Sequence, residues 1–127
     1  GLGTNDTKRI FMDRQQEVPA NLDSLLHKIH AWFKSKHLKT PKICVITPAP
    51  MDEARIDTAK YGGGDQRIRF NNIAFEKVVR QHRDDFLNSY SILKAGFPAK
   101  TIDGIHLKPA AQFELASLLV TYMLHKK

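Results

Sequence analysis

The chain has 127 residues, of which 42% are hydrophobic, and its formal net charge at pH 7 is +7. This length and composition fit a single folded domain with a modest core and exclude a low-complexity chain. No apolar run approaches the roughly 20 residues that cross a bilayer, and the N-terminus lacks the features of a signal peptide, so we expect no membrane span.

The first predicted element is an amphipathic helix from about Pro19 to His37, because apolar residues recur there at three- and four-residue steps. A β-branched run from Lys42 to Thr47 follows and ends at Pro48-Ala49-Pro50. Such a run is typical of a strand that is buried on both faces of a parallel sheet. Cys44 lies within it, and as the single cysteine it suits a buried, inert thiol rather than a disulfide.

The segment from Met51 to Gln66 is polar and contains Gly62-Gly63-Gly64, so we expect a long mobile loop. No strand immediately precedes the glycines and no Lys-Ser or Lys-Thr pair follows them, which excludes a nucleotide-binding loop. Helical spacing then predicts a second helix from Arg67 to about Phe86. The segment Phe86 to Leu93, ambiguous in phase, favours a short strand.

The last predicted helix begins at Pro109, a good first-turn residue. Its apolar positions form one stripe that should face the core: Phe113, Ala116, Leu119, Val120 and Met123. Strands that alternate with helices indicate an α/β layer architecture with a parallel sheet.

Cations are dense between Lys34 and Lys42, where the first helix should end. Positive charge there complements the helix dipole, so we expect a solvated helix end and no nucleic-acid partner. A non-catalytic basic binding module that uses this surface, with Trp32 and Phe33 as stacking groups, stays open as the alternative function.

Two segments carry residues of types that are capable of catalysis. Asp103 and His106, three residues apart before the last helix, are two-thirds of a hydrolytic triad that lacks its nucleophile. Gly3-Thr4-Asn5-Asp6 follows Gly1-Leu2, which look like the end of a strand. In open α/β sheets the ligand site lies beyond the carboxyl ends of the strands, so these segments carry most weight.

These two blocks resemble the third and fifth conserved blocks of the SGNH (GDSL-type) hydrolases. Gly3-Thr4-Asn5-Asp6 is similar to the glycine, any residue, asparagine, aspartate block, and Asp103-Gly104-Ile105-His106-Leu107 is similar to the block that carries the triad Asp and His. Their order, the interval between them and the final helix also match. The run from Gly3 to Lys8 is most similar to arylesterase-like members.

The resemblance implies a role for each matched residue. His106 would take the proton from a serine hydroxyl, and Asp103 would orient the imidazole. Asn5, in the block that begins at Gly3, would donate its amide to the oxyanion, and Asp6 would shape the loop around it. Met51 and Tyr61 are candidate pocket residues by position alone. The implied reaction is hydrolysis of a small acyl ester through a serine acyl-enzyme, without metal or cofactor.

The departure from the family pattern is the absence of its serine block and of its second, glycine-bearing block. The five serines of the chain lack the required sharp turn after a strand: Ser24, Ser35, Ser89, Ser91 and Ser117. We therefore expect residues 1–127 to be the C-terminal part of one SGNH-like domain, a three-layer α/β/α, flavodoxin-like fold without its N-terminal strands.

Such a half-domain should associate, either with the missing N-terminal half or with a second copy of the chain, since it exposes a sheet edge and an apolar face. A catalytically silent remnant is the other possibility. A metal site that uses His106, Asp103 and another histidine has little support, since His27 and His30 more simply share a solvated helix face. A cytoplasmic location is favoured by the unpaired cysteine, while export through a signal removed upstream stays open.

Overall fold

The computed structural model describes residues 3–125. The elements before the first strand are the 3₁₀ turns η1 (Asn5–Thr7) and η2 (Arg9–Arg14) and the helix α1 (Glu17–Ser35). The remaining elements are, in chain order, β1 (Cys44–Ile46), α2 (Thr58–Tyr61), α3 (Gly64–Gln81), β2 (Asp85–Leu87), α4 (Ser89–Leu93), α5 (Phe97–Lys100) and α6 (Pro109–His125). The strand end expected at Gly1-Leu2 lies outside the described residues. None of the helices within residues 3–125 is long and apolar enough to cross a membrane.

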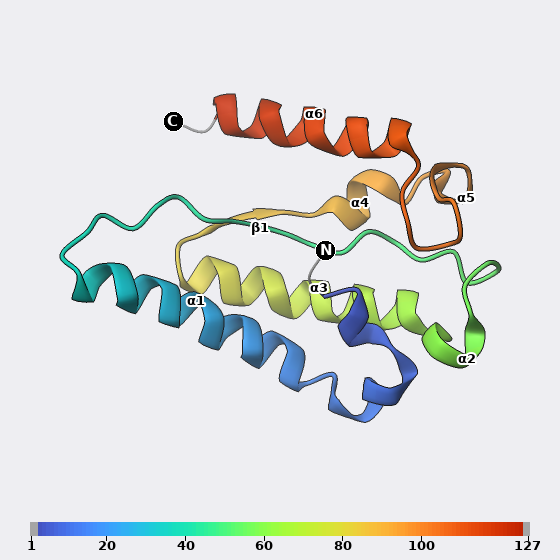
Figure 1. Cartoon of the computed structure of the whole chain (residues 1–127), viewed down its shortest axis with the longest axis horizontal. Helices are drawn as coiled ribbons and strands as arrows, with labels where there is room; N and C mark the ends of the chain where they lie inside the picture. The colour runs from blue at the N-terminus through green and yellow to red at the C-terminus, as the bar shows by residue number, and fades with distance from the viewer. Residues whose placement is uncertain (1–2, 126–127) are drawn as a thin grey trace.

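The two strands pair in parallel, with Cys44 opposite Asp85 and Ile46 opposite Leu87. A parallel pair needs a crossover connection, and here α2 and α3 supply it. Figure 1 shows α1 and α3 on one side of the strands and α6 on the other. The predicted α/β architecture with a parallel sheet is therefore confirmed, in a helix-rich form with a small sheet.

The strand after α1 is shorter and more exposed than its sequence predicts. Cys44 and Val45 are half-buried, and Ile46 is 37% exposed. Within the described residues the sheet consists of β1 and β2. The prediction of a strand buried on both faces, with a buried Cys44, is wrong, because Cys44 is only half-buried and Ile46 is exposed.

The helical layer is built by α1 and α3, whose apolar faces meet. Leu26 of α1 is buried, as are Phe75 and Val79 of α3. Both helices were predicted from their periodicity, and α1 begins and ends within two residues of the expected bounds. The second helix is shifted: it begins at Gly64 rather than at Arg67 and ends before β2, which takes up Phe86.

The prediction of a mobile loop from Met51 to Gln66 is wrong, because this segment is folded. It contains α2, whose N-terminus is capped by the Asp57 carboxylate, and the first turn of α3. Gly63 adopts φ +77°, and a Cβ on Gly64 would lie 2.5 Å from the sulfur of Met51. The glycines thus allow a tight helix-to-helix turn and a close approach to the core, rather than a flexible connection.

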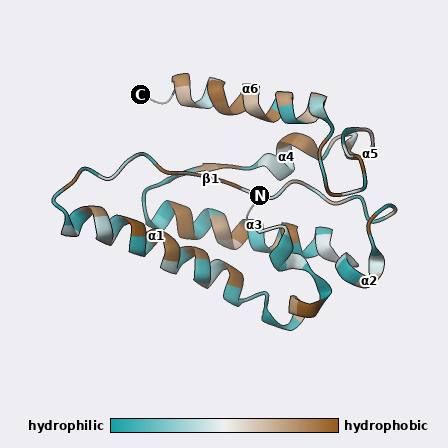
Figure 2. Cartoon of the chain, viewed as in Figure 1, coloured by the Kyte–Doolittle hydropathy of each residue, from teal (hydrophilic) through white to brown (hydrophobic). Residues whose placement is uncertain are grey.

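The final helix is correctly placed, but its predicted core face is exposed. Phe113 is 76% and Met123 64% exposed, whereas Ala111 on another face packs against Leu93 and Phe97. Figure 2 shows hydrophobic colour along much of α6, which lies apart from the α1 and α3 layer. Of the five stripe residues Leu119 is half-buried and the other four are exposed, so the prediction of a buried stripe is wrong for most of it.

Candidate active site

Three segments distant in sequence meet beyond the carboxyl ends of the strands: the N-terminal turn, the chain from Pro48 to Gly64, and the loop before α6. The Asp52 N–H donates to the Gly104 carbonyl over 2.9 Å, which joins the second segment to the third. The Tyr61 hydroxyl donates to Asn5 Oδ1 over 3.2 Å, which joins the second to the first. In Figure 1 these segments lie at the end of the molecule marked by α2 and α5.

Asp103 and His106 form a hydrogen-bonded pair, with 2.6 Å between Asp103 Oδ2 and His106 Nδ1. The other carboxylate oxygen accepts the backbone N–H groups of Ile105 and His106, at 3.0 and 2.8 Å. Nδ1 of the imidazole faces the carboxylate, so Nε2 is directed away from it. Since the His106 side chain is 73% exposed, Nε2 is accessible to a reacting group.

These hydrogen bonds lower the pKa of Asp103 to about 2. The backbone N–H of His106 contributes most, followed by the His106 side chain and the N–H of Ile105. The carboxylate therefore stays ionised throughout the neutral range. An ionised acceptor at Nδ1 keeps the proton on that nitrogen and leaves the Nε2 lone pair free to accept a proton.

The loop that carries this pair is built on a buried threonine. Thr101, fully buried, donates its hydroxyl to the His106 carbonyl and accepts the Gly104 N–H, both at 2.9 Å. Gly104 adopts φ +94°, and a Cβ there would lie 2.9 Å from the Asp52 carbonyl oxygen. The close packing of this loop on the chain after β1 holds the Asp–His pair at the end of the sheet.

Asn5 begins the η1 turn, whose backbone carbonyls are held by two side chains from outside it. Gln15 Nε2 donates to the Asp6 carbonyl over 2.7 Å, and Arg67 Nε donates to the Thr7 carbonyl over 2.8 Å. Burial lowers the pKa of Arg67 from its usual value, but a guanidinium remains charged at neutral pH. The turn that begins with Asn5 is thus held at the two residues that follow it, Asp6 and Thr7.

The role of Asp6 in shaping this turn is carried by its backbone, since its carbonyl accepts the Gln15 amide. Gly3 adopts φ +100°, and a Cβ there would lie 2.8 Å from Pro48 Cγ. A glycine at the start of this block therefore lets the N-terminal segment lie directly against the proline that follows β1.

The two predicted pocket residues have different surroundings. Tyr61 is half-buried, contacts Asn5 through its hydroxyl and packs its ring against the apolar cluster that includes Met51. Met51 itself is only 5% exposed and packs with Ile56 and Ile68, so it lies beneath the site. The sequence contained no signal for the contact of Tyr61 with Asn5 or of Arg67 with Thr7, because each joins segments that only the fold brings together.

No serine of the chain is hydrogen-bonded to His106 in the part that the structure describes. Ser89 is buried and donates to the Thr47 carbonyl, which leaves it without access to substrate. Ser35 bonds the carbonyl of Trp32 at the end of α1. The structure thus pairs Asp103 with His106 and links Asn5 to Tyr61, and among residues 3–125 no serine is hydrogen-bonded to this histidine.

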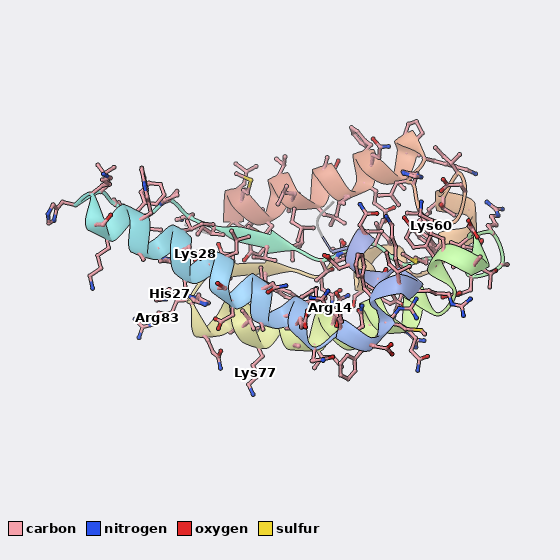
Figure 3. The ribbon with its side chains drawn as sticks, turned by 60° about the horizontal axis from the view of Figure 1, so that its bottom comes forward. Arg14, His27, Lys28, Lys60, Lys77 and Arg83 are labelled. Carbon is pink, nitrogen blue, oxygen red and sulfur yellow. The ribbon has the colours of Figure 1, made fainter. Side chains whose placement is uncertain are left out.

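Cationic side chains lie on several elements of the structure (Figure 3). Figure 3 shows Lys28, Lys77 and Arg83 along the layer of α1 and α3, and Lys60 at the opposite end on α2. Lys34 lies in the last turn of α1, as expected for a cation that complements a helix end. Within the described residues no group of three or more His, Cys, Asp or Glu side chains is arranged to hold a metal ion.

No family model matches the sequence, and no curated protein matches it either. Among solved structures, a carbohydrate acetylesterase from Sinorhizobium meliloti is similar, with 22% identity and a TM-score of 0.73 over 97% of this chain and 57% of that chain. The aryl esterase of M. smegmatis is similar as well, with 21% identity and a TM-score of 0.74 over 96% of this chain and 57% of its own.

A second carbohydrate acetylesterase family member from Sinorhizobium meliloti has 19% identity and a TM-score of 0.68, over 97% of this chain and 59% of that one. The chain thus spans less than two-thirds of the length of these structures. The predicted resemblance to SGNH-type, arylesterase-like hydrolases is confirmed as a likeness of fold, over part of the neighbours' length.

Proposed function

We propose that this chain supplies the acid–base pair and one oxyanion donor of an SGNH-type serine ester hydrolase. His106 is the general base, Asp103 orients it, and Asn5 donates its amide to the developing oxyanion. The observation that carries the proposal is the 2.6 Å contact between Asp103 Oδ2 and His106 Nδ1, with Nε2 left accessible. This is the arrangement that activates a serine hydroxyl.

The proposed reaction is acyl transfer to a serine followed by hydrolysis. His106 Nε2 takes the serine proton as the hydroxyl attacks the ester carbonyl, and returns it to the leaving alcohol. The Asn5 amide, on a turn held by Gln15 and Arg67, faces the oxyanion without reorganisation. One such preorganised donor lowers the barrier by roughly 3 to 4 kcal/mol. The chemistry requires neither a metal nor a cofactor.

In this proposal the nucleophilic serine and the second oxyanion donor come from a segment outside the 127 residues. Residues 1–127 then form the C-terminal part of one SGNH-like domain with a flavodoxin-like, three-layer α/β/α fold. The absence of a serine beside His106 in the described part supports this assignment, as does the 57% share of the neighbours' length. The exposed face of α6 would contact that segment or a second copy of the chain.

The proposed substrate is a small acyl ester. The similar structures are a carbohydrate acetylesterase and an aryl esterase. An aryl acetate such as p-nitrophenyl acetate has both an acetyl group and an aryl alcohol, and its hydrolysis releases a coloured alcohol. It is therefore the appropriate first substrate for a complete protein that contains these residues.

The test compares His106→Ala with His27→Ala in the complete protein. His27 is an exposed histidine on α1, which Figure 3 shows well away from Lys60 of α2, and it serves as the matched control. We expect His106→Ala to lower kcat for p-nitrophenyl acetate by several orders of magnitude and His27→Ala to leave it unchanged. Undiminished hydrolysis by His106→Ala would show that the triad assignment is wrong.

A further inference from the structure

The hydrogen bond between Tyr61 and Asn5 crosses 56 residues of sequence and ends on one particular atom. The Tyr61 hydroxyl donates to Asn5 Oδ1 over 3.2 Å. A side-chain amide carries an acceptor oxygen and a donor NH₂ on opposite sides of its carbon. When the oxygen is engaged by a hydroxyl donor, the NH₂ group is directed to the other side and its hydrogens remain available.

The orientation of this amide decides whether Asn5 can assist the reaction. An amide rotated by 180° would present its oxygen to the developing oxyanion, and two negative partial charges would then face each other. A donor that is already oriented costs no reorganisation at the moment of reaction. The Asn5 side chain is exposed, so without a partner for its oxygen both orientations would be populated.

Tyr61 is itself held in place from three directions. Its ring packs against the cluster of Met51, Ile56 and Ile68, and its carbonyl accepts from Arg67 Nη2 over 3.4 Å. The ammonium groups of Lys8 and Lys60 lie 5.9 and 5.6 Å from the ring centroid. Such cation–π contacts stabilise the position of an aromatic ring, and Lys8 belongs to the same N-terminal segment as Asn5.

We propose that Tyr61 is a positioning residue, which fixes the Asn5 amide with its NH₂ group toward the oxyanion. The proposal rests on the proposed function, because it assumes that Asn5 is an oxyanion donor. Tyr61 acts through Asn5 and not on the substrate. Its hydroxyl therefore contributes to kcat, and the contribution exists only while Asn5 is present.

The experiment is a double-mutant cycle in the complete protein with p-nitrophenyl acetate. Tyr61→Phe removes the hydroxyl and retains the ring, and one hydrogen bond of this kind corresponds to a roughly three- to tenfold loss in kcat. We expect KM to stay within twofold. Asn5→Ala should lower kcat by roughly 100-fold or more, and Tyr61→Phe added to Asn5→Ala should produce no further loss.

Tyr90→Phe is the matched control, since Tyr90 packs against the same cluster but donates its hydroxyl to Asp65. We expect it to leave kcat within twofold of the unmodified protein.

Each other outcome contradicts a specific step. Undiminished activity in Asn5→Ala contradicts the proposed function itself. If Asn5→Ala is impaired while Tyr61→Phe is unchanged, only the positioning role is overturned. The positioning role is also overturned if Tyr61→Phe raises KM alone, which indicates a pocket wall, or if it is equally harmful without Asn5, which indicates a general loss of structure.

Discussion

Replacement of Asp103 by asparagine separates the chemical from the structural role of this carboxylate. Asn is the same size, and its Oδ1 can still accept the N–H groups of Ile105 and His106, which lie 3.0 and 2.8 Å from Asp103 Oδ1. Its NH₂ group then replaces Oδ2, 2.6 Å from His106 Nδ1. A donor at that position favours the tautomer with the proton on Nε2, which cannot accept the proton of a serine.

The expected loss in kcat follows from the loss of the imidazole tautomer that can accept the serine proton. Loss of the correct imidazole tautomer lowers kcat by about 10⁴-fold in a serine triad, which corresponds to about 5 kcal/mol of barrier. Stability should fall only by what the charge itself contributes, because both backbone hydrogen bonds persist. Asp103→Ala removes these hydrogen bonds as well. Since the Asp103 side chain is half-exposed, we expect an additional loss of about 1 kcal/mol of unfolding free energy.

The assay measures p-nitrophenyl acetate hydrolysis and thermal unfolding for the unmodified complete protein and for both variants. The expected pattern is equal loss of activity in Asp103→Asn and Asp103→Ala, with the larger decrease of Tm in Asp103→Ala. If Asp103→Asn retains activity within tenfold of the unmodified protein, the carboxylate does not set the imidazole tautomer and the reasoning is refuted.

Three further predictions concern pH and stability. Because the pKa of Asp103 is lowered from 3.8 to about 2, its ionised form stabilises the fold above pH 4. This contribution should disappear between pH 4 and 2 in acid unfolding, and Asp103→Asn should lack it. Gly64→Ala should lower the free energy of unfolding by about 1 to 3 kcal/mol, and the Tm with it, since its Cβ would lie 2.5 Å from the Met51 sulfur. Helix propensity alone predicts a rise in Tm, so a raised Tm contradicts the packing. His30→Ala should lower the free energy of unfolding by about 2 kcal/mol in denaturant, because it leaves the buried Asp84 carboxylate without its 2.8 Å partner. Asp23→Ala removes one residue of a more exposed pair and should lower it by less than about 1 kcal/mol. Equal losses would contradict the difference in burial.

Elements whose signals lie within one stretch of sequence were predicted well. The periodicity of α1 and the proline at the start of α6 placed both helices, since a helix forms contacts between residues three and four apart. The Asp103–His106 pair is local in the same sense, because the two residues lie three apart and one loop joins them. Its geometry follows from a short segment, whereas its catalytic role is still a proposal.

Other features depend on contacts that no local pattern contains. The glycines of the segment from Met51 to Gln66 resembled a flexible loop, but Gly64 is needed where α3 packs against the core. The apolar stripe of α6 indicated a buried face, yet burial depends on which elements cover it, and four of its five residues are exposed. Propensity describes the preference of a segment and not its neighbours.

The sequence by itself determined α1, α6, the parallel α/β class and the spacing of Asp103 and His106, because these follow from local spacing and residue type. Only the tertiary structure placed the Asn5 amide next to the Tyr61 hydroxyl and braced its turn with Gln15 and Arg67. These contacts join residues up to 60 positions apart. Their geometry depends on how the N-terminal turn, α2 and α3 pack together, which no single segment encodes.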